Sequence, residues 1–135
     1  MTKIAYLATP YPHDDPKVRG KRFLEACQAV AGIANQGQPV YSPIAHTHTA
    51  TTLYGLAVGF EDRKAFNESM IDRCDSLLVL ITEGWSGSKG VAAEIEYARK
   101  QGKPVGVVFP EGDSSFKVSY DESLVNSALY LDYTG

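Results

Sequence analysis

The chain has 135 residues, of which 44% are apolar and 21% are charged, and this composition predicts a single domain over residues 1–135 with one buried core. The formal net charge is −3, and the 13 basic and 16 acidic residues are mixed along the chain, so no basic stripe indicates a nucleic-acid partner. No apolar run has the length of a signal peptide or a membrane span, so we expect a cytoplasmic protein with no membrane partner.

The first half of the chain predicts a strand, a helix and a second strand. Lys3–Ala8 is the first predicted strand, and two prolines in the loop after it forbid both a helix and a central strand. A helix begins after Asp15, an N-cap residue followed by proline, and ends at Gly37. Pro39–Ser42 is a short strand, and Pro43–Thr52 has no helical or strand period, which predicts a long surface loop.

The second half alternates helices and strands again. We expect, in chain order, a helical turn at Leu53–Val58, a helix at Glu61–Cys74, a strand at Ser76–Ile81, a helix from Gly90 to Gly102, a strand at Pro104–Phe109, a polar loop at Glu111–Tyr120, a short helix at Ser123–Ser127 and a fifth strand at Leu129–Leu131. This alternation predicts an α/β three-layer sandwich, flavodoxin-like or Rossmann-like, with a parallel five-stranded sheet in the order 2-1-3-4-5. Cys27 and Cys74 fit small core residues better than a disulfide or a metal site.

Glu94 is the first candidate for chemistry. It follows a buried strand and a small-residue turn, near the start of the next helix, and open α/β sheets bind ligands at that edge. Acidic residues near a helix N-terminus are also common because they complement the helix dipole, so catalysis and dipole stabilisation both stay open for Glu94.

Ser88 and Gly90 lie at the start of the same helix. A hydroxyl and a glycine there allow backbone amides to approach a phosphate closely, while serine is also among the commonest N-cap residues. Tyr6, in the first strand, fits either a core aromatic or a helper for a carboxylate. Thr9 and Tyr11 follow that strand, so we expect them across the same crevice from Glu94.

His46 and His48 lie in the predicted loop after the second strand. Two histidines at this spacing lack the third ligand expected of a zinc enzyme, so contact of His46 with a ligand is favoured over metal binding, and no metal or cofactor is expected. The sequence contains no Gly-x-Ser-x-Gly, Walker or Gly-x-Gly-x-x-Gly motif, which leaves carboxylate chemistry.

Five short segments carry a further signal. They are, in chain order, Ile4-Ala5-Tyr6-Leu7-Ala8-Thr9-Pro10-Tyr11, Ser42-Pro43-Ile44-Ala45-His46, Cys74-Asp75-Ser76-Leu77-Leu78-Val79-Leu80, Gly84-Trp85-Ser86-Gly87-Ser88 and Gly90-Val91-Ala92-Ala93-Glu94. Taken together, they resemble the nucleoside 2-deoxyribosyltransferase superfamily. The likeness covers about residues 3 to 109 and is closest to a branch of small bacterial and phage proteins. It is more distant from the deoxyribosyltransferases and the 2′-deoxynucleoside 5′-phosphate N-hydrolases.

The resemblance implies cleavage of an N-glycosidic bond, with Glu94 attacking C1′ of the sugar and Tyr6 positioning it. Water or a second base then resolves the glycosyl-enzyme, and a helix N-terminus would help to keep Glu94 ionised. Ser88 resembles the serine of the phosphate-requiring hydrolases, which favours a 5′-monophosphate because an aspartate there would repel phosphate. The implied ligand is a nucleotide or nucleoside, and relatives form homodimers or higher homo-oligomers, for which Tyr130–Gly135 is a candidate lid.

Asn67 departs from the family pattern. The family carries at this position an aspartate that helps to protonate the leaving base, and an amide cannot act as a general acid. Asp72, further along the same helix, is a candidate substitute, although helical geometry points it to a different face. The alternative function is therefore a non-catalytic protein that binds a nucleotide or an ADP-ribose-type ligand as a sensor or sequestering protein.

Overall fold

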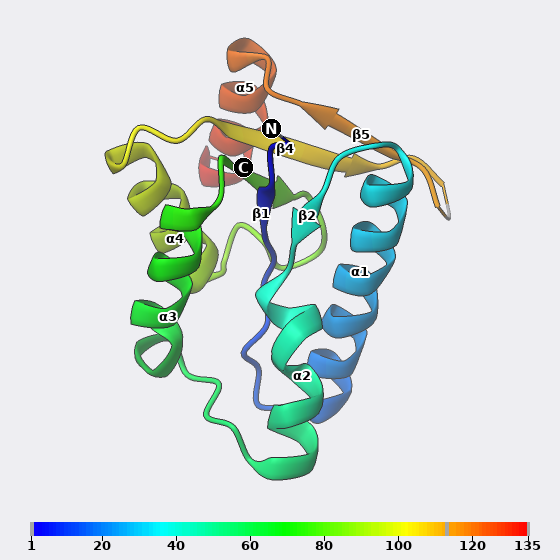
Figure 1. Ribbon diagram of the computed structural model, residues 1–135, viewed down its shortest axis with the longest axis vertical. Coiled ribbons are helices and arrows are strands. Elements are labelled where there is room, and N and C mark those ends of the chain that lie inside the picture. The colour runs from blue at the N-terminus through cyan, green and yellow to red at the C-terminus, as the bar shows by residue number, and fades with distance from the viewer. Residues whose placement is uncertain (1, 113, 135) are drawn as a thin grey trace.

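The computed structural model describes residues 2–112 and 114–134, with the side chains of residues 130–134 outside the description. Five strands and five helices follow one another in this part of the chain (Figure 1). They are β1 (Ala5–Ala8), α1 (Pro16–Asn35), β2 (Val40–Tyr41), α2 (Pro43–Tyr54), α3 (Phe60–Arg73), β3 (Ser76–Leu80), α4 (Lys89–Lys100), β4 (Val105–Pro110), β5 (Phe116–Ser119) and α5 (Glu122–Thr134).

The strands form one sheet in the order β2-β1-β3-β4-β5, so the predicted α/β fold and strand order are confirmed. β1 pairs in parallel with both β2 and β3, and β3 pairs in parallel with β4. β5 runs antiparallel to β4, so the prediction of a wholly parallel sheet is wrong at this edge. Few residues separate the two strands, and a parallel pairing would need a crossover of a dozen or more residues.

The fifth strand does not lie at Leu129–Leu131, as predicted, but within the segment expected to be a polar loop. Phe116 and Val118 alternate with polar residues and pack on the core, a period of two that is typical of a strand. Leu129 lies instead in α5, where its four-residue spacing from Val125 puts both buried side chains on one helical face.

Two apolar clusters fill the space between the sheet and the helices on its two faces. Tyr6 and Ala8 of β1 point to one face and pack in a cluster with residues of α3, α4 and α5. Ala5 and Leu7 point to the other face and pack in a second cluster with α1. Figure 1 shows α1 and α2 on one side of β1 and α3 and α4 on the other, which makes the expected three-layer sandwich.

The predicted loop after β2 is wrong, because Pro43–Tyr54 is the helix α2. Ser42 is its N-cap, with the side-chain oxygen accepting a hydrogen bond of 3.0 Å from the amide of Ala45, and Gly55 ends it in the left-handed conformation at φ 75°. α2 lacks the apolar stripe of an amphipathic helix, so the sequence shows no helical period here. The Ser-Pro start and the glycine end were the available signals for a helix.

The chain ends in α5, whose backbone is described to Thr134. The candidate lid at Tyr130–Gly135 lies outside the described side chains. Within the described residues, Cys27 and Cys74 are free thiols, and no helix has the length and apolar character needed to cross a membrane.

Candidate active site

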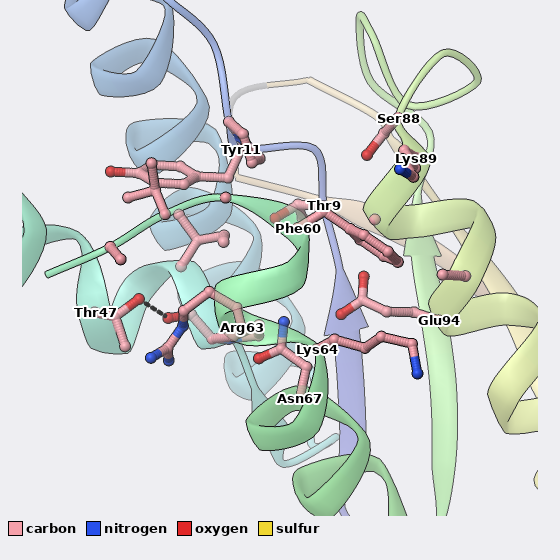
Figure 2. Close-up of a pocket in the computed structure, with 18 of the residues that line it drawn as sticks. Thr9, Tyr11, Thr47, Phe60, Arg63, Lys64, Asn67, Ser88, Lys89 and Glu94 are labelled. Atoms are coloured by element: carbon pink, nitrogen blue, oxygen red, sulfur yellow. Dashed lines mark hydrogen bonds between the residues drawn. The ribbon is translucent and has the colours of Figure 1, made fainter.

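A cavity of about 170 Å³ opens at the carboxyl edge of the sheet (Figure 2). The loop after β1 and the N-terminal end of α4 contribute to its wall, as do α2, α3 and the segment between these two helices. The sheet order makes β1 and β3 neighbours whose crossovers run to opposite faces, and a crevice forms at such a switch point. Of the candidate residues, the cavity wall includes Thr9, Tyr11, Asn67, Ser88, Gly90 and Glu94.

Glu94 projects into this cavity from the second turn of α4 and accepts a hydrogen bond from the hydroxyl of Tyr6. Tyr6 is completely buried in β1. Burial raises the pKa of the Glu94 carboxyl to about 7, although the hydrogen bond from Tyr6 lowers it. Glu94 lies beyond the first turn of α4, where the helix dipole acts most strongly, so the dipole does little to offset the effect of burial.

Ser88 is both an N-cap and a cavity residue. Its Oγ accepts a hydrogen bond of 3.2 Å from the amide of Val91, which is the ordinary capping contact. The first amides of a helix have no partner within the helix, so the Ser88–Gly90 segment offers donors at this end of the cavity. Lys89 adds a positive charge there, with its Nζ 4.9 Å from the centre of the Phe60 ring.

Thr9 and Tyr11 form the wall that follows β1. Thr9 is 7% exposed, and its Oγ1 is buried without a hydrogen-bond partner in the described part of the chain. The Tyr11 hydroxyl lies 2.6 Å from Nδ1 of His48, and the His48 ring stacks on Phe23 with centroids 4.2 Å apart. Burial, and then the charge of Arg19, lower the pKa of His48, which favours a neutral ring that orients Tyr11.

His46 is exposed and does not line the cavity. Its ring centre lies 6.3 Å from that of Tyr41. His48 rather than His46 is the histidine that supports the wall. Among the residues that the structure describes, no group of three His, Cys, Asp or Glu side chains could hold a metal ion.

α3 presents a polar face to the cavity, and sequence reasoning identified only one of its residues. Asn67 was a candidate, but Arg63, Lys64 and Glu68 also line the cavity. Arg63 and Asn67 are four residues apart and therefore share a helical face, which was the available signal. Both Nη2 of Arg63 and Oδ1 of Asn67 are buried with no hydrogen-bond partner among the described residues.

The two acids that follow Asn67 in α3, Glu68 and Asp72, both interact with other side chains. Glu68 forms an ion pair with Lys64, with Oε2 and Nζ 2.9 Å apart. Asp72, the suggested substitute for the missing acid, is exposed and accepts a hydrogen bond of 2.7 Å from the Tyr97 hydroxyl, and it does not line the cavity. Glu94 is thus the one carboxylate on the described cavity wall that is not ion-paired.

The fold and the cavity define an α/β protein with a carboxylate-bearing ligand site at the switch point of its sheet. The chain belongs to the family described as Domain of unknown function (DUF1937), whose model matches residues 3–109. That span contains every residue of the cavity wall, whereas β5 and α5 lie beyond it. No match was found among curated proteins.

Proposed function

We propose that the protein cleaves the N-glycosidic bond of a nucleoside 5′-monophosphate or nucleoside, with ribose or 2-deoxyribose as the sugar. Cleavage proceeds by hydrolysis or base transfer through a glutamyl-glycosyl intermediate. The observation that carries the proposal is Glu94, an unpaired carboxyl in the cavity, hydrogen-bonded by the buried hydroxyl of Tyr6. The resemblance of this segment and of the first strand to the nucleoside 2-deoxyribosyltransferase superfamily supports the same assignment.

The chemistry follows from the state of this carboxyl. With a pKa of about 7, roughly half of the Glu94 side chains are ionised at neutral pH and able to attack C1′. The Tyr6 hydrogen bond fixes one carboxyl oxygen, which leaves the other for attack. Loss of the base forms a glycosyl ester, and water or a second base then attacks C1′ and releases Glu94.

The phosphate end of the substrate is assigned to the start of α4. Ser88, Lys89 and Gly90 bring a hydroxyl, a cation and unpaired amides to one side of the cavity, between about one and two helical turns from Glu94. A 5′-phosphate bound there would place the adjoining sugar beside the carboxyl. Cytoplasmic location and assembly into homodimers or higher oligomers remain parts of this proposal.

The test is release of free base from a panel of nucleoside 5′-monophosphates and nucleosides. We expect the wild-type protein to release base, and Glu94→Gln to lose about 10³-fold or more in rate because an amide is a poor nucleophile. Glu96→Gln is the matched control, because Glu96 lies on the same helix but is exposed and outside the cavity. No free base from any substrate, or equal rates for Glu94→Gln and wild type, would sink the proposal.

One observation favours a second candidate function, the binding of a nucleotide or an ADP-ribose-type ligand without turnover. Asn67 stands where the related enzymes carry an acid, and no other free carboxylate lines the described wall opposite Glu94. Calorimetry separates the two functions. Slow continuing heat after each nucleotide injection indicates turnover, whereas simple saturation with no base released indicates a sensor or sequestering protein.

A further inference from the structure

Arg63 lines the cavity, and its charge has no ion-pair partner among the described residues. Its Nη2 is buried and has no hydrogen-bond partner in the described part of the chain, and its Cζ lies 4.6 Å from the centre of the Phe66 ring. The other cavity cation of α3, Lys64, is neutralised by Glu68. A guanidinium is always charged, and a buried donor of this kind is stabilised by an anion or by a strongly polarised carbonyl.

The position of Arg63 suits contact with the base, which is the leaving group of the proposed substrate. Asn67 lies one turn further along α3, and Figure 2 shows the Asn67 amide between Arg63 and Glu94. The start of α4, assigned to phosphate, lies on the other side of Glu94 in the same view. A nucleotide with its phosphate at Ser88 and its C1′ at Glu94 therefore extends its base toward Asn67 and Arg63.

We propose that Arg63 stabilises the departing base as an anion and so makes the chain selective for 2,4-dioxopyrimidine nucleotides, those of uracil or thymine. This inference rests on the proposed function. As a carboxylate oxygen of Glu94 bonds to C1′, the C1′–N1 bond breaks and its electron pair stays on the base. The charge spreads to the ring carbonyl oxygens, which accept hydrogen bonds from Arg63 and the Asn67 amide. Water then attacks C1′, and its proton ends on the base.

Apart from the nucleophile Glu94, the described cavity wall has no free carboxyl that could protonate the base, which makes this selectivity strong. Uracil can leave without protonation because two carbonyl oxygens share its negative charge, whereas cytosine has one carbonyl and leaves well only after it is protonated. Asn67 cannot supply that proton, and Glu68 is ion-paired. Uracil and cytosine are nearly the same size, so cavity shape alone would not separate their nucleotides.

The experiment compares three leaving groups on one sugar phosphate: deoxyuridine 5′-monophosphate, deoxycytidine 5′-monophosphate and 4-nitrophenyl 2-deoxyriboside 5-phosphate. We expect wild type to cleave the uracil substrate at least about 10²-fold faster than the cytosine substrate. Arg63→Met should lose about 10²–10³-fold on the uracil substrate, the typical effect of removing one donor to a developing anion. It should lose under about threefold on the nitrophenyl substrate, whose leaving group needs little help.

Two further variants show whether a loss of rate in Arg63→Met comes from the lost cation or from a change in folding. Arg63→Lys keeps a cation and should recover part of the rate on the uracil substrate. Arg73→Met removes a charge from the same helix, where Arg73 bonds Ser69 outside the cavity, and should behave as wild type. Equal losses on the uracil and nitrophenyl substrates, no loss in Arg63→Met, or preference for cytosine would overturn the role of Arg63 alone. Cleavage of none of the three substrates, while another nucleotide or nucleoside of the panel releases its base, would overturn the role of Arg63 alone. Release of no base from the whole panel would overturn the proposed function together with it.

Discussion

At the scale of single residues, the site is governed by competition between burial and hydrogen bonding at Glu94. Removing the carboxyl from water raises its pKa, and the Tyr6 hydroxyl, which donates to the ionised form, lowers it. Burial has the larger effect, so the pKa settles near neutrality. A carboxyl in this range changes its charge across the physiological interval and is sensitive to the loss of one hydrogen bond.

The pH dependence of the rate tests this balance. If ionised Glu94 is the nucleophile, kcat/KM should fall about tenfold for each pH unit below about 7. Tyr6→Phe keeps the ring in the core but removes the hydrogen bond that lowers the pKa of Glu94, so the falling limb should move to higher pH. The measurement is the pH–rate profile of both proteins.

Tyr41→Phe is the matched control for that profile. Tyr41 pairs with Tyr6 in the sheet register, and its hydroxyl has no hydrogen-bond partner among the described residues. Its removal should leave the limb in place. A Tyr6→Phe limb at the wild-type position would contradict the assigned hydrogen bond.

At the scale of elements, the antiparallel edge of the sheet depends on how closely α1 packs against it. α1 covers the face opposite α4, and its Gly32 lies against β5: a Cβ at Gly32 would lie 2.4 Å from the Phe116 ring and 2.9 Å from the carbonyl oxygen of Ser114. Such approaches are below normal contact distances. The antiparallel edge strand therefore needs a residue without a side chain on the helix that covers it.

Gly32→Ala should lower the free energy of unfolding by about 1–3 kcal/mol, because Phe116 is buried and the Ser114 backbone cannot shift freely. Gly20→Ala is the control on the same helix, where nothing lies within 4 Å of the added carbon. It should raise the free energy of unfolding by up to about 1 kcal/mol through helix propensity. Urea denaturation measures both, and equal signs for the two variants would refute the contact.

At the scale of the whole molecule, the buried carboxyl links the site to stability. The pKa of Glu94 rises from 4.5 to about 7 on folding, so between these pH values the unfolded chain loses a proton that the folded chain keeps. This contribution lowers stability as pH rises from about 4.5 to about 7 and is constant above that. The site therefore destabilises the fold most strongly under neutral and alkaline conditions.

Glu94→Gln removes this titration while keeping an oxygen that can accept from Tyr6. Relative to wild type, the variant should gain up to about 3 kcal/mol in the free energy of unfolding at pH 8 and little at pH 4.5. Urea denaturation at the two pH values gives the comparison. A gain of the same size at both would mean that the carboxyl is not held at a raised pKa.

The sequence predicted the first four strands and Glu94 as a candidate residue, and the predicted strand order is confirmed although the fifth strand lies elsewhere. Apolar runs at residues 4–8 and 77–81, each followed by turn residues, define buried strands by local physics, and the strand and turn before Ser88 place Glu94 at the sheet edge. The helical nature of residues 43–54 and the antiparallel strand at 116–119 were missed. α2 has no apolar stripe, and the alternation in β5 spans only four residues.

The sequence by itself determined the α/β class and the residue types that follow each buried strand, because these follow from periodicity along the chain. Only the tertiary structure decided the pKa of Glu94 and which side chains contact it. Its pKa depends on burial in the folded molecule and on a tyrosine 88 residues away in the chain. Arg63 became a candidate only when folding left its Nη2 buried and unpartnered, because desolvation is a property of the packed molecule.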